Sequence, residues 1–99
     1  MTVPERSPAV LAELVAETVA AHPSVVRLDG GAFGTIATWL PGRRLVGVGI
    51  DRADDPVEIG VVLRLDRPIP ATVAALRASV APLVDGVPVD VTVTDVEVT

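Results

Sequence analysis

Residues 57–93 read VEIGVVLRLDRPIPATVAALRASVAPLVDGVPVDVTV, and this stretch decides the fold. Apolar side chains alternate with polar or small ones over 57–65, which predicts a strand with one strongly apolar face. Over 69–84 the apolar residues recur at spacings of three and four, which predicts a helix. Alternation returns over 87–93, after a turn at Asp85-Gly86. The order predicts a β-α-β unit, whose crossover is right-handed when its two strands are parallel in one sheet.

Two irregularities are expected in and just after this unit. Pro82 lies near the end of the helix, where it removes one N–H donor and kinks or tightens the last turn. At Thr94-Asp95 the alternation slips by one residue, which indicates a bulge or the end of the strand.

The first part of the chain adds a helix and a short strand. Ser7-Pro8 is a favourable helix start, because the serine hydroxyl accepts a free backbone N–H and proline loses no hydrogen bond at the first position. One apolar stripe continues from there to His22, and Pro23 ends the helix. The β-branched segment 24–28 predicts a first strand.

A hairpin is predicted in the middle of the chain. The strand-like runs 35–40 and 45–50 are separated by Pro41-Gly42, a pair suited to the centre of a type II turn. Gly47 and Gly49 weaken the second run and suggest that a neighbouring element approaches the face that they share. Together with the strand that begins at Val57, the hairpin forms an antiparallel meander.

These elements predict a two-layer α+β domain in the order α-β-β-β-α-β, with one additional short strand. Two helices cover one face of a small mixed sheet, in a single domain over residues 1–99 with an ordered core from about 8 to 95. Hydrophobic residues make up 49% of the chain and charged residues 21%, which excludes a disordered protein. We expect an aliphatic core in which Phe33 and Trp39 are the only large rings.

Composition also excludes several classes of function. The chain contains no cysteine, so it has neither disulfides nor thiolate chemistry. A net charge of −5 repels phosphate backbones, and we expect no nucleic-acid partner. No apolar run is long enough to span a bilayer, and residues 1–8 lack the apolar run of a signal peptide. We therefore expect a cytoplasmic protein without membrane insertion.

Three features are candidate sites of chemistry, and each has a plainer explanation. The glycine-rich segment 30–34 forms either a phosphate-cradling loop or a tight turn, and it lacks the spacing of known phosphate motifs. His22 serves either as a general base or as a helix-end residue at the rim of the core. Asp51, Asp54 and Asp55 either bind a hard cation or form a solvated loop, and they do not match a calcium loop. The sequence therefore predicts no catalytic residue, cofactor or metal.

Small and amphipathic residues are the candidates for a partner surface. The second helix has alanines where a solvated helix normally has polar residues, so either the first helix or another molecule covers it. Trp39 either packs normally or anchors an interface on an open sheet face. An arginine pair at the hairpin turn either meets an acidic partner or an anionic headgroup, or is simply solvated. The candidate interface residues are Trp39, Arg43, Arg44, Ala71, Ala75 and Ala78.

The order and spacing of several segments resemble the alkaline shock protein family, also called the envelope stress response family, in the small single-domain form of high-GC Gram-positive bacteria. The segments that carry the resemblance are HPSVVRL at 22–28, GAFG at 31–34, ATWLPGRR at 37–44, PIP at 68–70, VAPLV at 80–84 and VDVTV at 89–93. The resemblance implies a non-enzymatic cytoplasmic protein that works close to the inner membrane face in cell-envelope homeostasis. It also implies self-association and association with membrane-anchored relatives, and it carries over no catalytic residue.

A second class of function remains open at this point. A small regulatory domain of similar architecture would bind a metabolite at a dimer interface, through a sheet edge or through the loop at 30–34.

Overall fold

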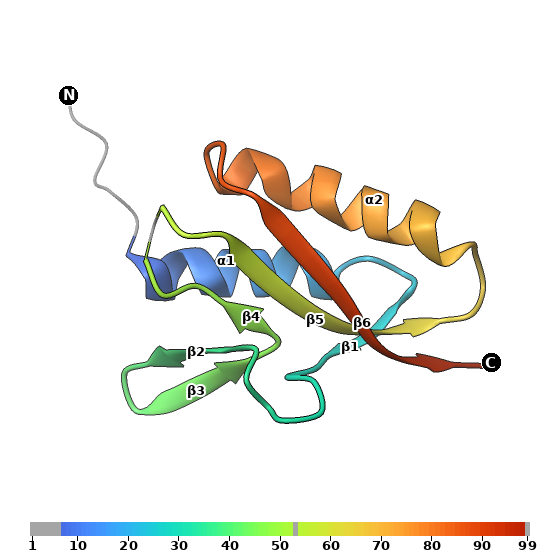
Figure 1. Ribbon diagram of the computed structural model, residues 1–99, viewed down its shortest axis with the longest axis horizontal. Coiled ribbons are helices and arrows are strands. Elements are labelled where there is room, and N and C mark those ends of the chain that lie inside the picture. Colours follow the sequence, from blue (N-terminus) through green and yellow to red (C-terminus); the bar gives the residue numbers. More distant parts are fainter. Residues whose placement is uncertain (1–6, 53, 99) are drawn as a thin grey trace.

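The computed structural model describes residues 7–52 and 54–98, so the expectation of no signal peptide falls mainly on residues outside the described part. The elements follow the predicted order and form an α+β fold with a mixed sheet (Figure 1). They are α1 (Pro8–Ala20), β1 (Val25–Leu28), β2 (Ala37–Leu40), β3 (Arg43–Val46), β4 (Val48–Gly49), β5 (Val57–Arg64), α2 (Ile69–Val80), the 3₁₀ helix η1 (Ala81–Leu83) and β6 (Val89–Glu97).

Strand β5 is the centre of the main sheet because it is paired along both edges. On one edge it runs parallel to β6, with Val57 opposite Val89. On the other edge its first half pairs with β4 and its second half with β1, both antiparallel. The parallel pairing of β5 and β6 around α2 confirms the predicted β-α-β unit.

Both predicted irregularities of this unit are present. The β5–β6 register shifts so that Val61 faces Val93 whereas Val62 faces Asp95, which leaves Thr94 as the extra residue of a bulge. At the end of α2 the chain tightens into η1, which contains Pro82. A proline there removes an α-helical donor, and the narrower 3₁₀ turn accommodates that loss.

The two helices lie on the same face of the sheet, where α1 passes behind β4 and β5 in Figure 1 and α2 runs alongside β6. One hydrophobic cluster fills the space between the layers. Its fully buried side chains include Val15 and Val19 of α1, Ile59 and Leu63 of β5, and Leu76 and Val80 of α2. The core is aliphatic as expected, but the expectation that it contains the two aromatic rings is wrong. Phe33 is 91% exposed and Trp39 is 78% exposed.

A hairpin forms at Pro41-Gly42 as predicted, but the expected second strand at 45–50 is divided between β3 and β4. The hairpin β2–β3 is a separate two-stranded sheet, so the expected continuous meander with β5 is wrong, and only β4 pairs with β5. The chain leaves β3 and enters β4 at Gly47, whose φ of +96° breaks the strand. A Cβ atom at Gly47 would lie 2.5 Å from the Leu28 Cβ atom, so the predicted close approach is confirmed there. At Gly49 the nearest atoms would be 3.5 Å away, an ordinary contact, and no close approach occurs.

Backbone hydrogen bonds through two glycines connect the hairpin to the main sheet. Ile36 accepts from the Gly47 N–H at 2.8 Å, and Gly47 accepts from the Gly60 N–H at 2.9 Å. The Gly60 carbonyl in turn accepts from the Asp29 N–H at 2.8 Å. A Cβ atom at Gly60 would lie only 2.0 Å from the Asp29 carbonyl oxygen, so the backbone crossing at this point leaves no room for a side chain.

The buried hydroxyl of Thr38 makes a further connection. It donates to the Val48 carbonyl and accepts from the Ile50 N–H at 3.0 Å. One side chain of β2 therefore satisfies two backbone groups at the edge of β4 that is not paired with β5.

Replacing Leu76 with alanine tests the position of α2. Leu76 is completely buried between helix and sheet, so we expect Leu76→Ala to lower the free energy of unfolding by about 2–5 kcal/mol in urea denaturation. Leu65→Ala is the matched control, because Leu65 is 54% exposed and its loss should cost about 1 kcal/mol or less. Equal effects of the two substitutions would contradict the packing described here.

The crossing at Gly60 predicts a difference between two glycines of neighbouring strands. Gly60→Ala forces the Asp29 backbone away and should lower the free energy of unfolding by about 1–3 kcal/mol. Gly49→Ala adds the same methyl group where only ordinary contacts exist, and should change stability by less than about 1 kcal/mol. Thermal or urea denaturation of both variants measures the difference, and an unaffected Gly60→Ala protein would refute the crossing.

Candidate interaction surface

The outward side of the hairpin β2–β3 presents the tryptophan of the chain. Thr38 and Leu40 are buried, whereas Trp39 between them is exposed because successive side chains of a strand point to opposite faces. Arg44 is the cross-strand partner of Trp39, and its guanidinium carbon lies 5.9 Å from the centre of the indole ring. This distance is within the range of a cation–π interaction, which orients both side chains on the surface.

Arg44 also connects the hairpin to the loop that carries Phe33. Its guanidinium donates a hydrogen bond to the Gly34 carbonyl, next to Phe33 in the chain. Val46, on the same side of β3 as Arg44, is 42% exposed and lies beside Gly30 at the base of the loop. We call this surface, made of Phe33, Trp39, Arg44 and Val46, the aromatic face.

The loop at 30–34 is a tight turn held by its own backbone. Gly34 donates its N–H to the Gly31 carbonyl, and Ile36 donates to the Gly30 carbonyl, both at 3.1 Å. The N–H of Gly31 is bound by the Asp29 carboxylate, also at 3.1 Å. Three N–H groups in and beside this loop thus already have acceptors within the chain and are not available to a phosphate. This favours the tight turn over the phosphate-cradling loop, the two alternatives that the sequence leaves open.

The Asp29 carboxylate that fixes this loop is stabilised in its charged form. The hydroxyl of Thr94, then the Gly31 N–H, and to a smaller extent the charge of Arg27 lower the pKa of Asp29, against a weaker opposing effect of burial. The loop tether is therefore fully present at neutral pH and is lost only when the pH falls through the lowered pKa of Asp29.

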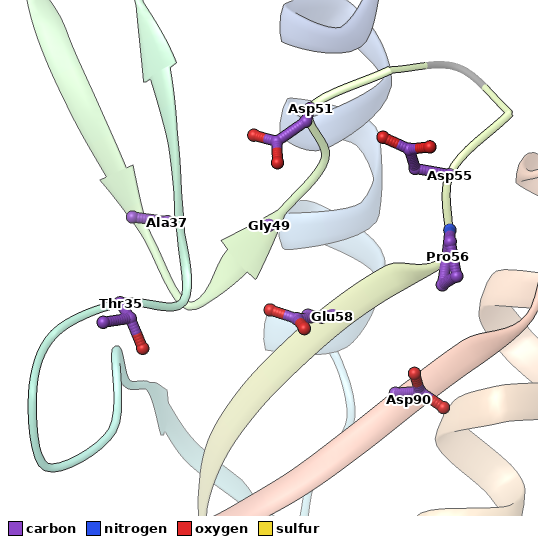
Figure 2. A pocket seen from close by; sticks show the side chains of 8 residues that line it. All are labelled: Thr35, Ala37, Gly49, Asp51, Asp55, Pro56, Glu58 and Asp90. Carbon is purple, nitrogen blue, oxygen red and sulfur yellow. The ribbon is translucent and has the colours of Figure 1, made fainter.

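A wide groove of about 310 Å³ adjoins the aromatic face, between the hairpin and the main sheet (Figure 2). Ala37, on the same side of β2 as Trp39, lines it on the hairpin side together with Thr35. Four carboxylates come from the other side, and we call their surface the acidic groove: Asp51 and Asp55 from the segment before β5, Glu58 from β5 and Asp90 from β6.

Glu58 and Asp90 are direct neighbours in the register of β5 and β6, on the sheet face turned away from the helices. Like charges at neighbouring positions of a sheet are unfavourable, so an outside positive charge would relieve them. Among the residues that the structure describes, no group of three or more His, Asp or Glu side chains is arranged to hold a metal ion. The four carboxylates make the acidic groove a negatively charged surface.

The predicted interface residues fall in three different places. Trp39 and Arg44 lie together on the aromatic face. Arg43 points to the other side of the hairpin, where it forms an ion pair of 2.6 Å with Glu13 of α1. Ala71, Ala75 and Ala78 are exposed on α2, in the helical layer. The buried alanines Ala12 and Ala16 belong to α1, so packing within the chain leaves these three alanines of α2 uncovered.

Several residues of this surface escaped the sequence analysis. Phe33 is expected in the core, and the only signal for a position outside it is the short glycine-rich segment, between Gly31 and Gly34, in which it lies. Glu58 and Asp90 both occupy polar positions of their strands, but only the register places them side by side. Of the three clustered aspartates, Asp51 and Asp55 line the groove, whereas Asp54 does not.

Comparisons with known proteins leave this surface to be interpreted from its own chemistry. No described helix has the length and apolar character needed to cross a membrane. Searches against protein-family models, curated proteins and solved structures find no match for the chain. The resemblance to the envelope stress response family therefore stays a prediction drawn from sequence motifs.

Proposed function

We propose that this chain is a non-enzymatic interaction domain of the envelope stress response type, and that it works by self-association through the aromatic face and the acidic groove. The observation that carries the proposal is the exposure of both aromatic residues of the chain, Trp39 on the hairpin and Phe33 in the loop that Arg44 joins to it. Solvent-exposed rings of this size contribute nothing to the core, whereas aromatic and arginine side chains are the residues that dominate binding at protein interfaces.

The charges of this surface favour a second copy of the chain as the partner. Arg44 lies on the aromatic face, and the four carboxylates of the acidic groove begin beside Ala37 on the same hairpin. In a two-fold contact, the aromatic face of each copy lies against the acidic groove of the other. The combined surface is then complementary to itself. Arg44 of each copy then meets the carboxylates of the other, which relieves the repulsion between Glu58 and Asp90.

The overall charge of the chain makes this local pairing decisive. Each copy carries a net charge of −5, so two copies repel one another in most orientations. Only orientations that place Arg44 against carboxylates, with Phe33 and Trp39 removed from water, turn this repulsion into attraction. Electrostatics thus select the geometry and the aromatic rings supply the affinity.

The cellular setting of the proposal follows from the family resemblance. We place the protein in the cytoplasm near the inner membrane face, in cell-envelope homeostasis, with membrane-anchored relatives as further partners. A surface that recognises a second copy would also recognise a relative with the same hairpin.

Sedimentation or light scattering across a concentration series tests the self-association. We expect the average mass to rise with concentration, and Trp39→Ala to weaken association at least about tenfold because it removes the central ring. Trp39 is exposed in the single chain, so the urea denaturation midpoint of this variant should stay close to that of the unmodified protein.

A charge exchange tests the geometry of the contact. Arg44→Glu should abolish association, whereas Arg77→Glu, the same change on the exposed side of α2 in the helical layer, should leave it nearly unchanged. Combining Arg44→Glu with Glu58→Arg in one chain should restore association, since each copy again offers opposite charges. A monomer at every concentration, or no difference between the variants at 44 and 77, would overturn the proposal.

A further inference from the structure

A second, smaller hollow lies between the end of α1 and the start of α2, away from the aromatic face. It has a volume of about 70 Å³ and is lined by His22, Arg67, Ala71, Thr72 and Ala75. The two alanines leave room where larger side chains would fill the space. No carboxylate is among the lining residues, in contrast to the acidic groove.

The tautomer of His22 is set by its neighbour Ser24. The backbone N–H of Ser24 donates to Nδ1 of His22 at 3.1 Å, so Nδ1 is an acceptor in this arrangement. In a neutral imidazole the proton then resides on Nε2, and the ring keeps one N–H donor that is not used by Ser24.

Thr72 contributes a hydroxyl that has no partner. The residue is only 4% exposed, and its hydroxyl makes none of the side-chain hydrogen bonds found among residues 7–52 and 54–98. Across this same part of the chain, no fully enclosed side-chain oxygen or nitrogen lacks a hydrogen bond. The Thr72 oxygen is therefore not sealed in the core, and the hollow that it lines is its opening. A nearly buried hydroxyl without a partner is unfavourable, so this position favours a bound acceptor.

The start of α2 adds a positive potential to the hollow. The cap residue Pro68 makes no side-chain hydrogen bond, and the first turn contains no acidic residue. The N–H groups of Ala71 and Thr72 share the Pro68 carbonyl as their only partner, at 3.2 and 3.3 Å. Free or weakly bonded N–H groups at a helix start attract anions.

Arg67 stands directly before this helix start as an available cation. It takes part in neither of the two ion pairs found among the described residues. The nearest acidic residue in the chain, Asp66, accepts a hydrogen bond of 2.9 Å from the Ser24 hydroxyl. The guanidinium of Arg67 can thus face an anion at the start of α2.

We infer that this hollow binds a single oxyanion of phosphate size, which completes the uncapped start of α2. The guanidinium of Arg67, the Thr72 hydroxyl and the His22 N–H are all donors, and the positive end of the α2 dipole adds to them. An oxyanion is the ligand that donors alone can satisfy. The volume of about 70 Å³ admits one phosphate or carboxylate group. This site shares no residue with the aromatic face or the acidic groove, so it stands apart from the proposed self-association.

An NMR titration with inorganic phosphate tests the inference on the whole chain. At constant ionic strength, we expect saturable shifts of the Ala71 and Thr72 amide signals with phosphate and none with chloride. Arg67→Ala should weaken phosphate binding at least about fivefold, because it removes a charge-assisted donor. Arg52→Ala removes the same charge from a distant exposed loop and should leave binding unchanged.

Thr72→Val distinguishes a bound anion from general charge screening. This substitution keeps the shape of the side chain and removes only the hydroxyl, so it should weaken phosphate binding while the net charge stays constant. Shifts that do not saturate, or that are equal in the variants at 52 and 67, would overturn the site.

Two further arms identify the source of the oxyanion. Sedimentation with phosphatidylglycerol vesicles and titration with acetate repeat the comparison of Arg67→Ala with Arg52→Ala. Arg67-dependent vesicle binding would assign a lipid headgroup, and Arg67-dependent binding of free phosphate or acetate alone would assign a soluble ligand. Independence from Arg67 in every arm would refute the inference, whatever the outcome for self-association.

Discussion

The structure depends on one close backbone contact, the crossing of the Asp29 carbonyl over Gly60 at the centre of β5. This contact lets the chain leave β1 across the outer sheet face, and the hydrogen bonds from Asp29 through Gly60 and Gly47 to Ile36 then fix where the hairpin begins. A side chain at Gly60 would displace all three segments together. The aromatic face and the acidic groove owe their positions to a place where the sequence has no side chain.

The sequence predicted the local elements well because their signals are local. The β-α-β unit, the bulge at Thr94 and the tightened turn at Pro82 all follow from periodicity or from proline chemistry within a few residues. The pairing of β1 with β5 joins residues more than thirty positions apart, and no pattern in either strand specifies it. The candidate surface was out of reach for the same reason, since the proximity of Glu58 and Asp90 is a matter of register between two strands. The alternation of β2 does not tell whether Trp39 or its neighbours point toward the core. The structure decides this, because the buried Thr38 hydroxyl bonds to the Val48 carbonyl and Trp39 therefore points outward.

The two sheet faces have different roles. The face toward α1 and α2 holds the whole aliphatic cluster and provides the stability of the domain. The opposite face of the main sheet carries adjacent carboxylates, and the hairpin and loop beside it carry exposed rings, groups that are unfavourable for an isolated chain. Proteins retain unfavourable surface groups where binding removes the penalty, and this division supports a surface function. The hollow at the start of α2 is comparable, because its hydrogen-bond donors lack partners within the chain and would gain them from a bound anion.

The fully aliphatic core also has a spectroscopic consequence. Because the single indole ring of the chain stands in water and the core holds no ring at all, intrinsic fluorescence is nearly blind to the packing of this domain. The emission of Trp39 should instead respond to whatever covers the hairpin, with a blue shift when solvent leaves the ring. The same property makes circular dichroism, and not emission, the suitable probe of unfolding for this protein.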